Sequence, residues 1–293
     1  MIWPNGAKTA FSLGFDMDGD TIWLNKTRNL PNGNTYLKGP SIGRYGTKKG
    51  ALHVLDILDE FNLKTTWFIP ADIVERHSDV VEKILERGHE IGHHGLDHTG
   101  EYGKNFEEQK ERILRCQDIF EKYTGYRAVG FRPTGYLLPE TERWIYGEGG
   151  FIYSSAGISG EACGYYEIEG TPTAAVNIPC RDEQMDDYVQ TVFHSYPAVL
   201  VGMPRIALYD NAYYNWVREV EGMICYGNSG SSAFHPQIAG TPGRAEVFRK
   251  FCKYLAENAD IWCTTCREIA EHYKLIMAVS YTHLRAHETR HDL

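Results

Sequence analysis

Carboxylate and imidazole side chains gather at a few points of this 293-residue sequence, and their spacing points to metal-assisted hydrolysis. Residues 14–20 read Gly-Phe-Asp-Met-Asp-Gly-Asp, which places Asp16 and Asp18 two positions apart. Residues i and i+2 of a strand face the same side, so both carboxylates can enter one site, and Asp20 can join them if the strand continues. Crowded carboxylates repel one another unless a cation or a proton separates them.

Histidines follow in the segment 93–98, which reads His-His-Gly-Leu-Asp-His. His94 and His98 are four residues apart, a spacing that lets both bind one metal ion. His89 and His93 have the same spacing, so spacing alone does not choose between the pairs, although His89 falls inside a predicted strand and is interpreted as structural. Two histidines and one carboxylate leave an open position at which water is activated and a carbonyl is polarised. The remaining aspartate can act as general base, and a histidine on the opposite side can protonate a leaving amine.

Apolar periodicity predicts the elements that must position these groups. Strands are expected at 9–16, 64–70, 89–92, 127–131, 151–155, 231–234 and 260–263, and helices at 51–61, 72–87, 106–123, 140–148, 211–223, 243–259 and 267–275. This alternation predicts an α/β fold with parallel strands, in a barrel or an open doubly wound sheet. Ligands bind at the carboxyl ends of such strands, which is where the sequence places the two aspartates, the histidine pair, Arg132 and His235. The two long loops at 17–46 and 156–196 are expected to be functional.

Composition excludes several classes of partner. Asp and Glu outnumber Lys and Arg by 39 to 30, for a net charge of -9, and no basic cluster suggests nucleic acid or an acidic membrane surface. No apolar run reaches the roughly 20 residues that span a bilayer, and the first residues lack the features of a signal peptide. The seven cysteines are odd in number and scattered, which favours a reducing cytoplasm. The pair Cys263 and Cys266 is interpreted as two buried thiols, with a redox or zinc role as the alternative.

One domain is expected over residues 1–278. Residues 279–293 form a polar tail, interpreted as a disordered, non-native read-through segment. His283, His287 and His291 of this tail are spaced like metal ligands, but the tail follows a finished strand-helix unit and is left out of the predicted site.

Four motifs together carry a family resemblance, namely residues 15–20, 88–98, 131–136 and 234–240. In this order they resemble those of the NodB-homology polysaccharide deacetylases, which have the fold of carbohydrate esterase family four, over nearly all of residues 1–274. The resemblance implies a distorted (β/α) barrel with seven strands. It also implies a divalent metal, usually zinc, bound by Asp18, His94 and His98. Such a ligand set also accepts cobalt, manganese or iron.

The same resemblance assigns the remaining roles. Asp16 would be the general base, Arg132 would orient it, and His235 would protonate the leaving nitrogen. The backbone N–H of Tyr136, after Gly135, would help to hold the oxyanion. Met17 separates Asp16 from Asp18, and this split resembles a cytoplasmic branch of peptidoglycan-deacetylase-like proteins, cyclic imidases and allantoinase-like enzymes. Members of that branch form homo-oligomers, here expected as a dimer or tetramer, with a small pocket that would be lined by Asp187, Trp23 and Arg44.

The predicted activity is therefore metal-dependent hydrolysis of a non-peptide C–N bond. The first hypothesis is N-deacetylation of an N-acetylated amino sugar or short glycan. The alternative is ring-opening hydrolysis of a small cyclic amide or imide, which needs the same catalytic groups and differs in pocket shape. A third hypothesis is a barrel that has lost activity and serves as a binding protein.

Overall fold

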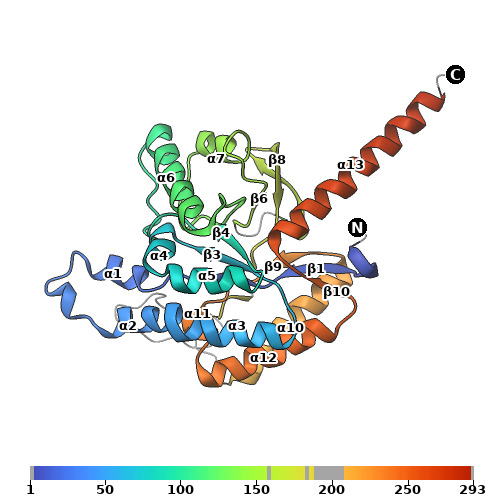
Figure 1. Ribbon diagram of the computed structural model, residues 1–293. Coiled ribbons are helices and arrows are strands. Elements are labelled where there is room, and N and C mark those ends of the chain that lie inside the picture. Colours follow the sequence, from blue (N-terminus) through green and yellow to red (C-terminus); the bar gives the residue numbers. More distant parts are fainter. Residues whose placement is uncertain (1–2, 157–159, 182–184, 188–207, 292–293) are drawn as a thin grey trace.

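A parallel β-sheet covered by helices forms the body of the molecule (Figure 1). The structure, a computed structural model, describes residues 3–156, 160–181, 185–187 and 208–291, with side chains up to residue 279. The seven-stranded sheet has the order β2-β3-β4-β5-β6-β8-β7, and a three-stranded sheet has the order β10-β1-β9. The strands are β1 (Thr9–Ser12), β2 (Gly14–Asp16), β3 (Thr66–Ile69), β4 (Glu90–His93), β5 (Gly130–Phe131), β6 (Tyr153–Ser154), β7 (Gly164–Ile168), β8 (Thr171–Asn177), β9 (Gly230–Ser231) and β10 (Ile261–Cys263).

Hydrogen bonds outside the regular ladders join the two sheets. β1 and β2 are consecutive parts of the predicted strand 9–16, and Phe15 pairs in parallel with Phe234, beyond β9. On its other side β9 is bonded to the segment after β8, where Cys180 pairs with Ser231. β9 therefore lies between β1 and the segment that follows β8. The predicted α/β fold is confirmed, and these pairings are consistent with a distorted (β/α) barrel whose ladders are interrupted.

The helices follow the strands in the expected alternation. They are α1 (Thr21–Thr27), α2 (Lys38–Tyr45), α3 (Ala51–Glu60), α4 (Ala71–Arg76), α5 (Ser78–Glu86), α6 (Phe106–Thr124), α7 (Pro139–Ile145), α10 (Tyr209–Tyr226), α11 (Pro236–Ala239), α12 (Pro242–Glu257) and α13 (Cys266–His291). Asn105 caps α6 by accepting from the Glu108 N–H, and Gly125 ends that helix with a left-handed φ of 81°.

Aromatic side chains pack the layer between the sheet and the helices. Phe15 stacks on Trp67 with ring centroids 4.8 Å apart and meets Phe248 of α12 edge-on at 5.5 Å. All three are fully buried, and each contributes about 1.5–3 kcal/mol of hydrophobic stabilisation. Strand residues alternate in direction, so the neighbouring Phe68 faces the opposite side and meets Tyr153 edge-on at 6.4 Å.

Both predicted long loops contain secondary structure. The range 17–46 includes α1 and α2, and the range 156–196 includes the antiparallel hairpin β7–β8. The hairpin turns at Glu169 and Gly170, whose φ angles are 50° and 76°, a conformation typical of two-residue hairpin loops. Glutamate is an unusual residue at the first of these positions, which explains why the turn was missed. The predicted helix 72–87 is interrupted at His77, with φ -132° and ψ 40°, so it forms α4 and α5.

The last helix is much longer than the predicted 267–275. α13 spans 26 residues, and its backbone is helical to His291, where the sequence predicted a disordered tail over 279–293. Figure 1 shows this end projecting away from the body of the molecule, and Leu275 and Val279 are exposed on it. That the tail is non-native remains a prediction. Among the described helices, neither α13 nor any other combines the length and apolar character needed to cross a membrane.

Candidate metal centre and catalytic groups

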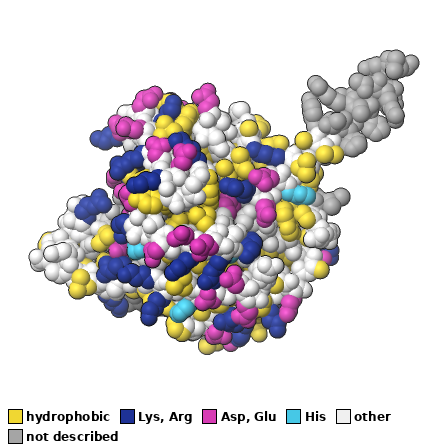
Figure 2. All heavy atoms as spheres, viewed as in Figure 1, with side chains coloured by type: hydrophobic (Ala, Val, Ile, Leu, Met, Phe, Trp, Pro, Cys, Tyr) yellow, Lys and Arg dark blue, Asp and Glu magenta, His cyan; other side chains and the backbone are white. Residues whose placement is uncertain are grey.

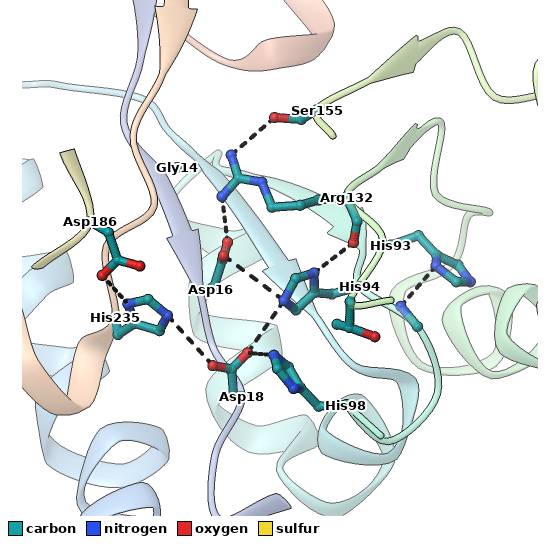
Figure 3. Close-up of polar contacts among 12 residues, drawn as sticks. Gly14, Asp16, Asp18, His93, His94, His98, Arg132, Ser155, Asp186 and His235 are labelled. Carbon is teal, nitrogen blue, oxygen red and sulfur yellow. Dashed lines mark hydrogen bonds and ion pairs between the residues drawn. The ribbon is translucent and has the colours of Figure 1, made fainter. Parts of the chain in front are cut away.

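The predicted site residues converge where the strands end. Asp16 is the last residue of β2, and Asp18 follows it on the connection to α1. His94 comes directly after β4, and Arg132 comes directly after β5. His235 directly precedes α11, just beyond the residue that pairs with β2. Figure 3 shows these side chains pointing toward one another from separate elements.

Asp18 lies at the centre of the group and is fully buried. Its Oδ1 is 3.4 Å from His94 Nε2 and 3.5 Å from His98 Nε2, and its Oδ2 is 3.6 Å from His235 Nε2. Neither oxygen accepts a hydrogen bond from the described residues. Burial alone would raise the pKa of Asp18, but the imidazoles of His98, His94 and His235 hold it below its ordinary value. A buried, charged carboxylate that accepts no hydrogen bond is costly unless a cation balances its charge, so Asp18 is a candidate metal ligand.

The two histidine ligands present the nitrogen that a metal needs. His94 Nδ1 donates to the carbonyl oxygen of Arg132 at 2.7 Å, which leaves the lone pair of Nε2 directed at Asp18. His98 reaches the same oxygen from a backbone with φ 52°, in a turn that also contains Gly95 at φ 80°. Ligand atoms of Asp18, His94 and His98 all lie within 4.8 Å of one another. Two imidazoles and one carboxylate fit zinc, and the set also suits cobalt, manganese or iron.

The other equally spaced histidine pair has different partners. His93 Nδ1 accepts from the Gly95 N–H at 3.1 Å, and its ring packs edge-on against Phe131, with ring centroids 4.5 Å apart. His89 Nδ1 accepts from the Thr65 N–H at 3.2 Å. Both side chains are buried away from the ligand cluster, so the structure favours the pair that the family resemblance assigned.

Asp16 is held by a buried guanidinium. Arg132 Nη1 donates to Asp16 Oδ1 at 2.5 Å, and Arg132 Nη2 donates to Ser155 Oγ at 3.0 Å and to Ser231 Oγ at 2.8 Å. Burial alone would lower the pKa of Arg132, but Asp16 keeps it above the ordinary value, so the side chain is a permanent cation. The second oxygen of Asp16 is 3.9 Å from His94 Nε2 and faces the centre. Sequence reasoning missed both serines, although each falls in a predicted strand.

His235 has a carboxylate partner that the sequence did not indicate for it. Its Nδ1 donates to Asp187 Oδ1 at 2.8 Å, and its backbone N–H donates to Asp187 Oδ2 at 2.9 Å. Burial alone would lower the pKa of His235, but Asp187 and Asp186 raise it to about 10. The ring is therefore protonated at neutral pH and presents Nε2–H to the centre. Asp187, predicted as a pocket-lining residue, is 1% exposed and hydrogen-bonds to the ring of His235.

We expect Asp187→Asn to move the basic limb of the pH–rate profile to lower pH. Removing the carboxylate at 2.8 Å lowers the pKa of His235, so the proton that it must donate is lost earlier as the pH rises. A shift of about one pH unit or more corresponds to at least ~1.4 kcal/mol. The measurement is kcat against pH for the variant and the native chain. Asp186→Asn is the matched control, because Asp186 lies farther away, at 3.8 Å, and should shift the limb less. An unchanged limb in Asp187→Asn would contradict this role.

Asp20 does not join the cluster. Gly19 adopts a left-handed φ of 60° and turns the chain away, and Asp20 then accepts from Arg76 at 2.8 Å and from Arg44 at 3.3 Å. The possibility that Asp20 points into the site was therefore wrong. Arg44 is partly exposed and is engaged with this carboxylate. Trp23 is fully buried and packs on Gly39, where an added Cβ would lie 2.2 Å from the indole.

The loop after Arg132 carries the predicted oxyanion residues. Tyr136 is 73% exposed. The resemblance implicates its backbone N–H and not its side chain. Gly135 approaches the backbone of Gly100 so closely that an added Cβ would lie 2.2 Å from its oxygen. Only glycine fits there without moving the loop.

The two cysteines of the CxxC pair have environments that suppress reactivity. Burial raises the pKa of Cys263 and of Cys266 to about 12, so neither thiol ionises near neutral pH. Cys266 is buried and Cys263 is partly buried, which supports the interpretation of the pair as unreactive thiols.

Comparisons with known proteins find relatives in sequence and in fold. Residues 39–152 match the model of the family described as polysaccharide deacetylase. A peptidoglycan deacetylase of Helicobacter pylori is 22% identical over 89% of this chain and 95% of its own length. The crystal structure of a putative polysaccharide deacetylase from Mycobacterium smegmatis superposes with a TM-score of 0.83 at 28% identity, over 94% of each chain. The structure of Puue allantoinase has the same fold, with a TM-score of 0.74 at 21% identity over 92% of each chain. The chain covers 48% and 34% of the lengths of the next two relatives.

Proposed function

This chain carries a polysaccharide deacetylase domain of the NodB type, and from that premise we propose that it is a metal-dependent hydrolase that removes the N-acetyl group from an amino sugar or short glycan. The observation that carries the proposal is the arrangement around Asp18. One of its oxygens faces His94 and His98, and the other faces His235. Asp16 stands beside the same centre, so three candidate ligands, a base and an acid meet in one place (Figure 3).

The ligand set of Asp18, His94 and His98 would hold the metal, with zinc as our proposal. A divalent ion bound there polarises the amide carbonyl and makes a nearby water more acidic. Asp16, held by Arg132, accepts the proton of the attacking water. The backbone N–H of Tyr136 donates to the oxygen that becomes negative in the tetrahedral intermediate. His235 then donates the Nε2 proton to the departing nitrogen, and Asp187 stabilises the imidazolium that carries this proton.

A second candidate is ring-opening hydrolysis of a small cyclic amide or imide. The observation that favours it is the split Asp16-Met-Asp18, which resembles the branch that contains cyclic imidases and allantoinase-like enzymes. The same base and acid would act, but the leaving nitrogen would stay attached to the product. Met17 is fully buried, so the two carboxylates are held apart by a residue that anchors the turn in the core.

Several finer properties belong to the same proposal. The sequence favours a cytoplasmic protein that assembles as a homodimer or homotetramer. Trp23 and Arg44 are proposed to shape the pocket wall, Arg44 through its contact with Asp20. The substrate is proposed to be a small molecule or a short glycan, with no nucleic acid or membrane as partner.

We expect the zinc-loaded enzyme to remove acetyl groups from N-acetyl amino sugars. Mass spectrometry of products from a panel of N-acetyl amino sugars, cyclic imides and hydantoins checks this, with the His94→Ala variant as the control. Loss of about 42 Da from a sugar, the net change when hydrogen replaces one acetyl group, supports the first candidate. Gain of one water by a ring compound supports the second. If no compound changes, the hypothesis of an inactive binding protein is favoured.

A further inference from the structure

The two histidines of the proposed metal centre are held in different ways. The ring of His94 is oriented by the hydrogen bond from its Nδ1 to the carbonyl oxygen of Arg132, at 2.7 Å. The ring of His98 faces Asp18 and meets the His94 ring edge-on, with centroids 5.2 Å apart, but it makes no hydrogen bond with another residue that the structure describes. Histidine ligands are usually oriented by a bond of the kind that His94 makes. The direction of the His98 ring therefore depends on the backbone that carries it.

The side chain of Asp97 closes the turn that contains His98. Asp97 Oδ1 accepts from the Thr99 N–H at 3.3 Å and from Thr99 Oγ1 at 2.7 Å, so the carboxylate spans the residue between them. His98 has a φ of 52°, in the left-handed region that residues with a Cβ rarely adopt. Such a conformation persists only where neighbouring contacts maintain it, and the bonds from Thr99 to Asp97 are contacts of this kind.

The backbone before His98 is held by two helices. The first two N–H groups of α4 donate to the carbonyl oxygens of Gly95 and Leu96, at 3.0 and 2.9 Å. Asn25 of α1 donates through Nδ2 to the carbonyl oxygen of Asp97 at 2.6 Å. Arg28 in turn donates to Asn25 Oδ1 at 2.7 Å, which orients the amide. Three successive carbonyl groups before the ligand are thus bonded to neighbouring elements.

Arg112 of α6 binds the same carboxylate oxygen, because its Nη2 donates to Asp97 Oδ1 at 2.8 Å. Figure 2 shows Lys and Arg side chains lying among Asp and Glu side chains over the visible face, and isolated ion pairs on a surface contribute little to stability. This pair differs from them in two ways. Its side chains are only 26% and 27% exposed, and the accepting oxygen also serves both donors of Thr99. Three donors on one oxygen keep the carboxylate in one position.

We propose that Asp97 is a positioning residue for the metal ligand His98, and that Arg112 and Asn25 hold Asp97 in turn. Asn25 belongs to α1, the helix that begins three residues after Asp18. Its bond to Asp97 therefore joins the segment of one ligand to the segment of another, and the turn at 97–99 sets the separation of Asp18 and His98. This inference rests on the proposed metal centre.

The affinity for zinc, measured by competition with a chromophoric chelator, tests this role. We expect Asp97→Ala to lower the affinity about 10- to 100-fold, the range typical of groups that orient a metal ligand. Asp97→Asn should stay within about threefold of the native chain, because the asparagine oxygen can still accept from both donors of Thr99. The visible absorption spectrum of the cobalt-loaded protein reports ligand geometry, and it should change in Asp97→Ala but not in Asp97→Asn.

Asp59→Ala is the matched control, because Asp59 accepts from Arg87 at the same distance of 2.8 Å but belongs to α3, outside the ligand loop. It should leave the zinc affinity and the cobalt spectrum unchanged. If Asp97→Ala fails to fold, as judged by far-UV circular dichroism, Arg112→Met decides. We expect it to weaken zinc binding about two- to fivefold, as the loss of one partly exposed ion pair would.

Two kinds of failure can be told apart. A native chain that binds no zinc would overturn the proposed metal centre and this inference together. Zinc binding that is unchanged in folded Asp97→Ala, or in Arg112→Met where it decides, overturns the inference alone. Equal losses in Asp97→Ala and Asp97→Asn would also overturn it, since the turn would then not be the cause.

Discussion

Replacing His94 by alanine should remove the metal and the activity together. The side chain supplies one of three ligand atoms that lie within 4.8 Å of one another, and the remaining two cannot complete the coordination. We expect the metal content to fall from about one ion per chain to near zero. The turnover number should fall about 10³-fold or more, since a Lewis acid contributes several kcal/mol to such a reaction. Metal analysis by mass spectrometry and steady-state hydrolysis measure the two effects on the same sample.

A second variant separates this effect from a general loss of folding. His89→Asn alters another buried histidine, and the asparagine oxygen can still accept from the Thr65 N–H as His89 Nδ1 does. It should keep both metal and activity. A His94→Ala protein that retains metal and turnover, with a normal far-UV circular dichroism spectrum, would show that the ligands lie elsewhere.

Asp16→Asn should lose hydrolysis but retain the metal, whereas His94→Ala should lose both. Asparagine has the same shape and can accept the Arg132 Nη1 hydrogen bond through its oxygen, but it cannot take a proton from water. We expect kcat to fall roughly 10²- to 10⁴-fold, the usual contribution of a positioned general base. Metal content and thermal unfolding should match those of the native chain. Parallel measurement of kcat, KM and bound metal checks the prediction.

Asp20→Asn provides the comparison for this variant. Asp20 is also buried, four residues away, and accepts from Arg76 and Arg44 outside the ligand cluster. It should change kcat by only a few-fold. If Asp16→Asn retained near-native turnover, another group would have to be the base. If it lost metal, Asp16 would have to be counted among the ligands.

Much of the candidate site was predictable because each group sits next to a strand with a strong apolar pattern. The strand at 9–16 carries the buried aromatic residues Phe11 and Phe15, and the strand at 64–70 carries Trp67 and Phe68. The positions of Asp16 and Asp18 at a strand end therefore followed from the apolar pattern. Choosing His94 and His98 needed the family resemblance, because spacing could not distinguish them from His89 and His93. The structure supports the choice through contacts that no one-dimensional pattern records.

Other features could not be obtained from sequence for physical reasons. Asp187 contacts His235 across 48 positions, so only the tertiary structure brings them together. Asp20 leaves the cluster because Gly19 takes a positive φ, and a glycine in a sequence does not reveal which conformation it adopts. The hairpin β7–β8 was missed because its first strand is half exposed and lacks a clear alternation of apolar residues.

The hydrogen bonds of Arg132 have a consequence for how such an enzyme can change over evolutionary time. This one side chain reaches Asp16 on β2, Ser155 after β6 and Ser231 on β9, and it lies over the Phe68 ring with its guanidinium carbon 4.0 Å from the centroid. The orientation of Asp16 is thus determined by strands in the interior and not by the connecting segments at the rim. Those segments can lengthen, shorten or exchange residues, and thereby admit different amides, while the proton-accepting carboxylate stays in place. The architecture separates the part that must be inherited unchanged from the part that is free to diversify.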